Sequence, residues 1–293
     1  MKSRMLLTDF SLSQLCVHWQ ISRQSYYQGL KRQQLKSLQE DIILELVREQ
    51  KHVLPQSGGL KMLHLIRPDL SKMHIDIGRD RFFQLLRSHD LLVKRKRKYV
   101  YTTDSNHPFK IYANRIKDLK IKSVFQVLVA DITYIRTLEG FLYLALLTDL
   151  YSRKIIAWDL SDSLELEGCL RALRRALRLV PKTMTKTKDW CIHHSDRGSQ
   201  YCSYAYTGLL KANQIGISMA AVGNCYENAT AERVNGILKS EFALDQGFST
   251  KSIALKSVQN AVDLYNHKRP HRSLNMNTPQ QVFDSNFNEL FCF

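Results

Sequence analysis

The sequence predicts an α/β protein in which a basic helical part precedes a mixed β-sheet that is covered by helices. Three observations lead to this prediction: apolar residues recur at helical spacing before about residue 122, β-rich apolar runs follow, and most of the positive charge lies in the first part. The chain has 293 residues, with 43 Lys or Arg and 27 Asp or Glu, and a formal net charge of +16. Its 44% hydrophobic content is ordinary for a globular chain, which excludes a disordered basic tail.

Neither a membrane nor an oxidising compartment is indicated. The longest uninterrupted apolar run, 141–147, is far shorter than the ~18 residues that a membrane helix needs, and the first ten residues lack the apolar segment of a signal peptide. The 6 cysteines form no C-x-x-C pair, so we expect a cytoplasmic chain with reduced thiols. Zinc ligands are available in Cys191, His193, His194 and Cys202, but their spacing fits no common zinc finger.

The excess positive charge is concentrated in residues 1–122. This part has 24 Lys or Arg and 11 Asp or Glu, whereas the rest has 19 and 16. A basic run flanked by Tyr99 and Tyr101 is typical of a surface that binds a phosphate backbone, and a solvated charged turn is the alternative. The residues of this run are Lys94, Arg95, Lys96, Arg97 and Lys98.

The first helices form a helix-turn-helix pattern over residues 1–54. Apolar residues at helical spacing predict a helix over 12–19. A second helix begins after Ser22, which we interpret as its N-cap, and has Arg23 in its first turn. Because such units bind DNA, we expect Arg23 to contact the phosphate backbone.

A second basic helical region, with a linker, is predicted over residues 55–122. A helix around Ile42 leads into it, Pro55 and the Gly58-Gly59 pair interrupt the chain, and a helix around Leu63 follows. A third helix over 78–89 has its arginines on the outer face. Short helices with basic outer faces favour DNA binding, and a bundle that binds another protein is the alternative.

From residue 123 the pattern changes to strands. Three runs rich in β-branched and aromatic residues, 124–135, 141–150 and 154–160, predict three consecutive strands. A turn at Glu139-Gly140 separates the first two, which predicts an antiparallel pair.

Helices and strands then alternate to the end of the sheet. Ser163 is the predicted N-cap of a helix that Pro181 ends. A strand over 190–193, a helix from Tyr201, a strand over 214–219 and a helix over 227–241 complete the order β-β-β-α-β-α-β-α. This order predicts a ribonuclease-H-like mixed sheet with helices on both faces, in a domain over 123–293.

Three acidic residues are the candidate catalytic and metal-binding groups. Asp131 interrupts an apolar strand, where an ionised carboxylate is costly unless something pairs with it; a bond to Thr133 or an arginine is the structural alternative. Asp196 follows a strand directly, which is the usual place for functional groups in α/β sheets, although a turn or N-cap aspartate is the alternative. Glu232 lies on the later helix, with 35 residues between it and Asp196.

The predicted topology brings these three carboxylates together. The first and fourth strands are neighbours in a ribonuclease-H-like sheet, and the later helix would place Glu232 over them. Oxygen ligands of this kind suit Mg²⁺, with Mn²⁺ as the alternative ion. Two such ions support in-line displacement at phosphorus, so the sequence predicts phosphodiester chemistry.

The chain resembles the OrfB-type transposases of the insertion-sequence-three family, which are relatives of retroviral integrases and share the same Asp, Asp and Glu spacing. The resemblance covers nearly all of the catalytic region, and the start of the chain also matches. In one departure, Glu227 stands where the family often has Asp, which leaves the role of that carboxylate open. The matching segments are 21–27, 130–135, 150–158, 194–201, 228–229, 231–232, 238–241 and 265–274.

The resemblance implies a bacterial DNA transposase that cuts the 3′ ends of its element and joins them to other DNA. It implies terminal inverted repeats and target DNA as partners, a homo-oligomer on DNA, and fusion to or pairing with the product of an upstream reading frame. Two alternatives remain. One is a ribonuclease-H-like nuclease that never joins strands, and the other is a catalytically inactive DNA-binding regulator.

For several further residues, contact with DNA is one of two interpretations. Lys239 falls two helical turns after Glu232, so it would hold a phosphate beside the metals or remain a solvated surface lysine. Lys268, Arg269 and His271 would line the DNA path or close the end of a helix. Asp149 we interpret as a structural turn or salt-bridge residue.

Overall fold

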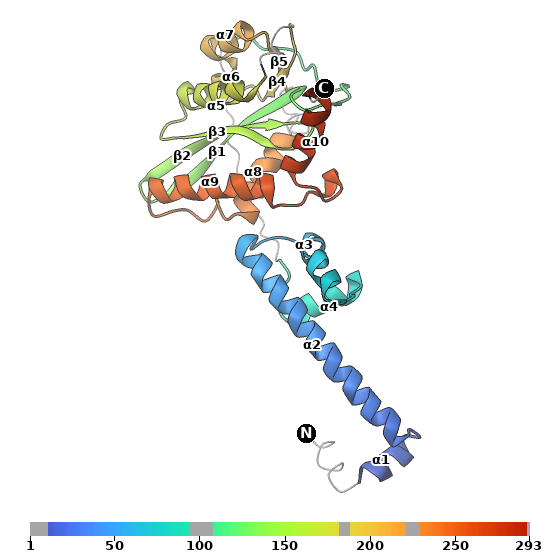
Figure 1. Ribbon diagram of the computed structural model, residues 1–293. Coiled ribbons are helices and arrows are strands. Elements are labelled where there is room, and N and C mark those ends of the chain that lie inside the picture. The colour runs from blue at the N-terminus through green and yellow to red at the C-terminus, as the bar shows by residue number, and fades with distance from the viewer. Residues whose placement is uncertain (1–10, 94–107, 182–187, 221–228, 292–293) are drawn as a thin grey trace. The chain divides into compact units, whose positions relative to one another are not determined.

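In the computed structural model of the chain, residues 11–93, 108–181, 188–220 and 229–291 are described, and they divide into two units (Figure 1). The first unit consists of residues 1–52 and 58–92, and the second of 53–57 and 93–293. Among the helices of the described residues, none is long and apolar enough to cross a membrane.

The first unit is helical throughout its described part. The Ser22 hydroxyl accepts a 3.0 Å hydrogen bond from the backbone N–H of Ser25, so the predicted N-cap is confirmed. Gly29 does not end the following helix, because the residues on either side of it are good helix formers. The helices are α1 (Leu12–His18), α2 (Arg23–Val53), α3 (Gly59–Lys72) and α4 (Arg79–Ser88).

One apolar core joins the C-terminal part of α2 to α3 and α4. Its members include Val47 of α2, Ile66 of α3 and Phe82 of α4, which are all fully buried. The division expected at residue 54 therefore separates helices that share a core. Helical periodicity shows that each helix has an apolar face but does not show which faces pack together.

The second unit contains a five-stranded mixed sheet in the order β3-β2-β1-β4-β5. β1 pairs antiparallel with β2 and parallel with β4, and β4 pairs parallel with β5. The predicted ribonuclease-H-like fold class is confirmed by this topology. The strands are β1 (Val127–Thr137), β2 (Gly140–Asp149), β3 (Ile155–Ser161), β4 (Ile192–Ser195) and β5 (Gly216–Met219).

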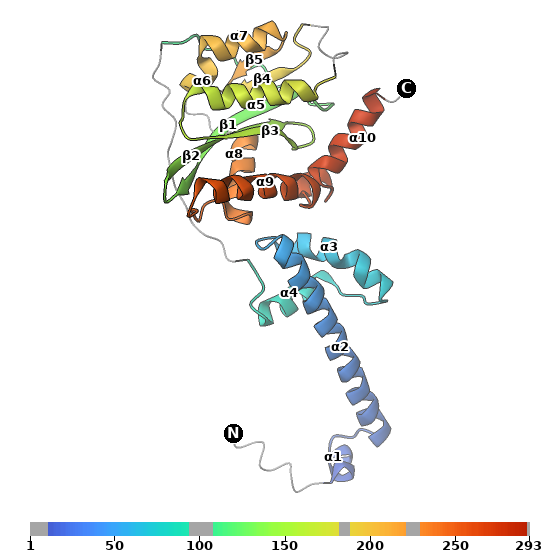
Figure 2. The same cartoon turned by 60° about the vertical axis from the view of Figure 1, so that its left-hand side comes forward.

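Helices cover both faces of the sheet (Figure 2). α5 and α7 pack on the face that carries Leu128 and Ala130, whereas α8 and α9 pack on the face that carries Ile135 and Leu144. The helices are α5 (Leu166–Leu179), α6 (Ser199–Cys202), α7 (Tyr204–Ala212), α8 (Ala229–Glu241), α9 (Lys251–His267) and α10 (Pro279–Phe291).

The start of α5 differs from the prediction. Its N-cap is Glu165 rather than Ser163, and no side chain caps the helix. α5 approaches β3 so closely that a Cβ on Gly168 would lie 2.3 Å from the Ser161 hydroxyl oxygen. Packing of the helix on the sheet thus decides where it begins.

Residues before the predicted domain boundary at 123 also belong to the second unit. Ile116, Leu119 and Ile121 pack against the buried cluster formed by Val127, Val129 and Ala231. The backbone N–H of Arg115 donates a 2.9 Å hydrogen bond to the Ser218 hydroxyl at the end of β5. The segment 108–122 is therefore part of the second unit.

Asp149 has the structural role that the sequence analysis assigns to it. Its carboxylate is fully buried at the end of β2 and accepts hydrogen bonds from the backbone N–H of Phe125 (2.8 Å) and of Ser152 (2.7 Å) and from the Ser152 hydroxyl (2.6 Å). Burial raises its pKa, and these three bonds oppose the rise. The aspartate holds the β2–β3 turn to the start of β1.

Candidate active site

Asp131 lies in the middle of β1 on the face that α8 covers. One carboxylate oxygen accepts a 2.7 Å hydrogen bond from the side-chain amide of Asn235 on α8, and the other accepts a 2.9 Å bond from the backbone N–H of Ile132. The carboxylate is therefore held in a fixed orientation although it interrupts an apolar strand. Neither Thr133 nor an arginine is the partner in these bonds.

Asp196 lies one residue beyond the end of β4, at the same level as Asp131. In the parallel pairing of β1 with β4, Val129 is opposite His194, so two further residues along each strand lead to Asp131 and Asp196. One Asp196 carboxylate oxygen accepts a 3.0 Å hydrogen bond from the backbone N–H of Gly198. The sheet register thus brings the first two candidate acids to neighbouring positions.

The charges of these acids act on one another. The pKa of Asp131 is raised to about 7, first by burial and then by the charge of Asp196, with a smaller contribution from Glu232. The hydrogen bonds from Asn235 and Ile132 oppose this rise. Because two neighbouring carboxylates of like charge cannot both ionise freely, the site has an unbalanced negative charge that a cation would neutralise.

Glu232 lies in the first turn of α8 and is exposed. Partial burial and the charge of Asp196 raise its pKa, which places it within electrostatic range of the aspartates. Near the N-terminus of a helix its negative charge is favoured by the helix dipole. The position agrees with a third ligand that approaches the site from the helix above the sheet.

The donor atoms fit a hard divalent cation. All three candidate groups are carboxylates, and oxygen ligands are those that Mg²⁺ and Mn²⁺ prefer. No three His, Cys, Asp or Glu side chains within the described ranges converge closely enough to form a complete metal site. The residues therefore match the cation by chemistry and by their electrostatic interactions, of which the one between Glu232 and Asp131 is the smallest contribution to the raised pKa of Asp131.

Asn235 is a residue of the candidate site that the sequence analysis did not identify. It lies three positions after Glu232 on α8 and is 6% exposed. Its amide N–H₂ donates to Asp131, while its amide oxygen is buried without a hydrogen-bond partner among the described residues. The available signal was its helical spacing from Glu232, which puts both residues on neighbouring parts of one face.

Two cationic side chains contact the elements that carry the acids. Lys239 on α8 has its ammonium group 4.2 Å from the centre of the Tyr134 ring on β1, a cation–π contact. Arg153, in the β2–β3 turn, donates a 3.0 Å hydrogen bond to the Thr230 hydroxyl in the first turn of α8. Arg153 thus ties the beginning of the helix that carries Glu232 to the sheet.

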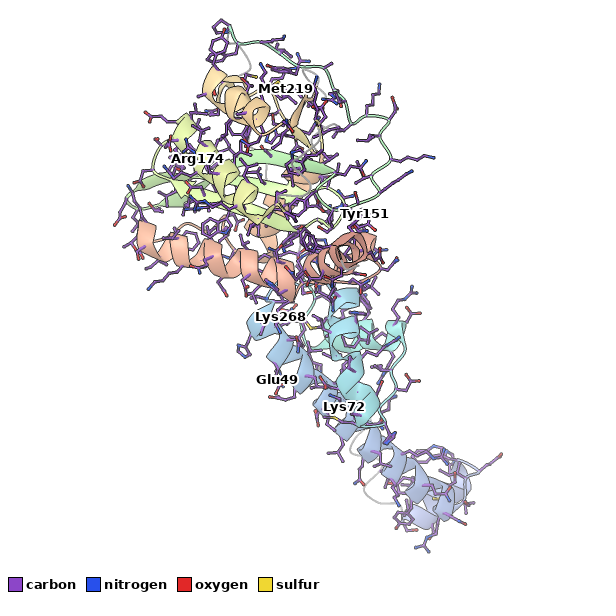
Figure 3. The ribbon with its side chains drawn as sticks, turned by 45° about the horizontal axis from the view of Figure 1, so that its top comes forward. Glu49, Lys72, Tyr151, Arg174, Met219 and Lys268 are labelled. Carbon is purple, nitrogen blue, oxygen red and sulfur yellow. The ribbon has the colours of Figure 1, made fainter. Side chains whose placement is uncertain are left out.

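The remaining predicted DNA contacts fall into three groups. Lys94 to Lys98 lie outside the described residues, as does Glu227. Arg23 is exposed in the first turn of α2. Lys268 is exposed at the C-cap of α9 and is labelled in Figure 3. Arg269 and His271 are buried, and their side chains contact other residues of the same unit.

Arg269 and His271 close the end of α9. The Arg269 guanidinium donates two hydrogen bonds of 2.8 and 2.6 Å to the Glu241 carboxylate at the end of α8. The His271 ring packs edge-on against Tyr265, with ring centres 4.9 Å apart. Asn266 bonds both backbone groups of Ile155 on β3. These contacts favour the structural interpretation of this segment over a DNA path.

The histidines considered as zinc ligands are part of the core. His193 shares a 2.9 Å hydrogen bond with the Tyr206 hydroxyl, and His194 shares one of 2.9 Å with the Ser218 hydroxyl. Burial lowers the pKa of His193 to about 3, so the ring is neutral at physiological pH. Cys191 and Cys202 are buried free thiols.

Comparison with known families and sequences identifies clear relatives. Residues 122–225 and 213–279 each match a family model described as an integrase core domain. The chain is 32% identical over 268 residues to an uncharacterized 31 kDa protein of insertion element IS600 from Shigella sonnei, a match that covers 90% of this chain and 96% of that protein. It is 34% identical over 204 residues to the transposase InsF of insertion sequence IS3fB from Escherichia coli, covering 69% of each chain.

Solved structures with a similar chain path are retroviral. The catalytic core domain of HTLV-2 integrase, in complex with magnesium, aligns at 15% identity with a TM-score of 0.42, over 54% of this chain and 96% of that one. A simian T-cell lymphotropic virus intasome chain aligns at 14% identity with a TM-score of 0.46, over 78% of this chain and 70% of that one.

Proposed function

The chain belongs to the transposases of the insertion-sequence-three type, which contain an integrase core domain, and from this premise we propose that Asp131, Asp196 and Glu232 are its catalytic carboxylates. Its function is DNA transposition. The observation that supports the residue assignment best is the register of β1 with β4, which sets Asp131 and Asp196 side by side. The raised pKa of Asp131, to which the charge of Asp196 contributes, adds to this support.

The reaction proposed has two displacements at phosphorus. In the first, a water oxygen attacks the phosphodiester at the 3′ end of the element, one P–O bond forms, and the bond to the 3′ oxygen breaks to leave a 3′-OH. In the second, that 3′-OH attacks a phosphodiester of other DNA, and a 3′-OH of that DNA leaves. Each step breaks one P–O bond as it forms another, so no external energy source is needed.

Asp131, Asp196 and Glu232 would hold divalent cations, Mg²⁺ or Mn²⁺, in pairs. When bound, such cations supply Lewis acidity that activates the attacking oxygen and stabilises the leaving one. Asp131 is oriented for this task by Asn235, and Asp196 by the backbone of Gly198. Lys239 presents a cation on α8 that would hold a DNA phosphate near the acids.

Under this proposal Asn235 is a positioning residue. Its replacement by alanine is expected to lower the joining rate about 10–100-fold, which is the usual cost of removing a residue that hydrogen-bonds to a metal ligand. The divalent-metal concentration for half-maximal activity should rise, because Asp131 would lose its orienting hydrogen bond. Measurement of the joining rate against metal concentration tests this result. Asn235→Gln, with the same amide on a longer chain, should recover part of the activity. A metal dependence identical to that of the wild type would contradict the role.

DNA would be held mainly by the basic front part. The exposed Arg79 and Arg87 on α4, Arg23 on α2 and the run from Lys94 to Lys98 would contact phosphates and release counterions, so binding should weaken steeply with salt. The terminal inverted repeats and target DNA are the proposed substrates. A homo-oligomer on DNA and pairing with an upstream reading-frame product are further parts of the proposal.

A joining assay separates this function from the two alternatives. Duplex DNA that carries an element end is labelled on the cut strand and incubated with the chain, unlabelled plasmid and Mg²⁺. We expect the label to become covalently attached to plasmid DNA, and a chelator to abolish attachment. Shortened label without attachment would indicate a nuclease, and DNA binding without either product would indicate a regulator.

A further inference from the structure

The N-terminal part of α2 carries an apolar stripe that faces solvent. At about 100° of helical rotation per residue, its four members lie within about 80° of one another and roughly opposite to Val47, which is buried in the core of the first unit. We name this set the α2 stripe. Its members are Tyr27 (53% exposed), Leu35 (54%), Leu38 (60%) and Ile42 (37%).

Among the described residues, the side chains in the N-terminal part of α2 are almost all exposed. From residue 23 to 39 every side chain is exposed except that of Tyr26, which is partly buried. Figures 1 and 2 both show α3 and α4 beside the C-terminal part of α2 only. Because most helical stability in proteins comes from packing of an apolar face, a partner on the stripe would stabilise this part of α2.

Charge along α2 indicates which partner fits. Residues 23–39 contain four basic side chains and no acidic one, whereas residues 40–53 contain four acidic and two basic side chains. A second α2 in parallel would set like charges against each other. An antiparallel second copy would set the basic half of each helix against the acidic half of the other, as complementary surfaces do.

We propose that two copies of this chain associate through the α2 stripe as antiparallel helices, with Leu38 of each copy against Ile42 of the other. In this register Lys31 lies opposite Glu49 of the second copy, and both residues fall at the same helical angle as the stripe. The apolar centre is small, so the dimer should have a Kd on the order of 1–10 µM, typical of limited interfaces.

Sedimentation equilibrium of the full chain without DNA tests the surface. The wild type should convert from monomer to dimer between about 1 and 50 µM, and Leu38→Glu with Ile42→Glu should weaken the dimer at least about 100-fold, because each substitution acts in both helices. Gln33→Glu with Ser37→Glu adds the same charge on the opposite side of α2 and should leave the dimer unchanged. Circular dichroism checks that all variants keep their helices.

Charge reversal tests the orientation. Lys31→Glu with Arg32→Glu should weaken the dimer about tenfold or more, and so should Glu45→Lys with Glu49→Lys. All four substitutions in one chain should restore it in an antiparallel pair, whereas in a parallel pair like charges would still face each other.

Four outcomes would overturn the proposal. The first three are a wild type that stays monomeric at about 50 µM, a dimer that survives Leu38→Glu with Ile42→Glu, and a fourfold variant that does not recover. A chain that pairs only after an upstream reading-frame product is added would also overturn it. Asp131→Asn should leave the dimer unchanged, so failure of the catalytic assignment is distinguished from failure of this one.

Discussion

Replacement of Asp131 by asparagine is expected to lower strand cleavage and joining by at least about 10³-fold while DNA binding remains. Asparagine has nearly the same shape, and its amide oxygen can still accept the hydrogen bond from Asn235, so the fold should tolerate it. It lacks the negative charge that a divalent cation requires of its ligand. Asp196→Asn and Glu232→Gln should have effects of similar size for the same reason.

Cleavage and joining of labelled element ends, with binding measured separately by gel shift, test this expectation. Asp162→Asn is the matched control, because Asp162 is a largely exposed acid of the same unit that pairs with Lys251. Its activity should stay within about twofold of the wild type, as is usual for surface substitutions. If a carboxylate variant cleaves at the normal rate, that residue is not one of the catalytic set.

Replacement of Arg269 by alanine is expected to destabilise the second unit by about 3–5 kcal/mol. The Arg269 side chain is 4% exposed and donates two hydrogen bonds to Glu241, so its removal takes both bonds and the compensating charge away from a mostly buried carboxylate. The melting temperature should fall by roughly 6–20 °C for a unit of this size. Thermal unfolding followed by circular dichroism measures the change.

Two further variants distinguish a structural role from a DNA contact. Arg272→Ala removes the same charge from an exposed position three residues later and should change stability by less than about 0.5 kcal/mol. Arg269→Met combined with Glu241→Met should recover part of the loss, because replacing both partners leaves no unpaired charge. A normal melting temperature together with weakened DNA binding in Arg269→Ala would instead support a place in the DNA path.

The first two catalytic candidates could be predicted because each breaks a local pattern. Asp131 is a carboxylate within an apolar strand, and Asp196 follows a strand end. Their proximity follows from the parallel pairing of β1 with β4, which the predicted topology already contained. Glu232 has no such local signal, because an exposed glutamate on a helix is common, so its assignment depended on its spacing and on the family resemblance.

Asn235 illustrates what the sequence did not reveal. A polar residue on a helix is ordinary, and only the packing of α8 on β1 makes its amide a donor to Asp131 across 104 residues of sequence. The extent of the first unit is a similar case. The apolar faces of α2, α3 and α4 are each visible in the sequence. Only the structure shows that they pack into one core, so the expected division at residue 54 separates helices that share a core.

The sequence by itself determined the order of the strands, the concentration of positive charge in the first 122 residues, and two of the three acidic candidates. These features are local, since periodicity and charge are read within a few turns of one element. Tertiary structure alone decided that Arg269 binds Glu241, that Asn235 orients Asp131, and that the α2 stripe faces solvent. The reason is physical: the partner of a side chain is fixed by long-range packing, and packing joins residues whose separation in the sequence carries no signal.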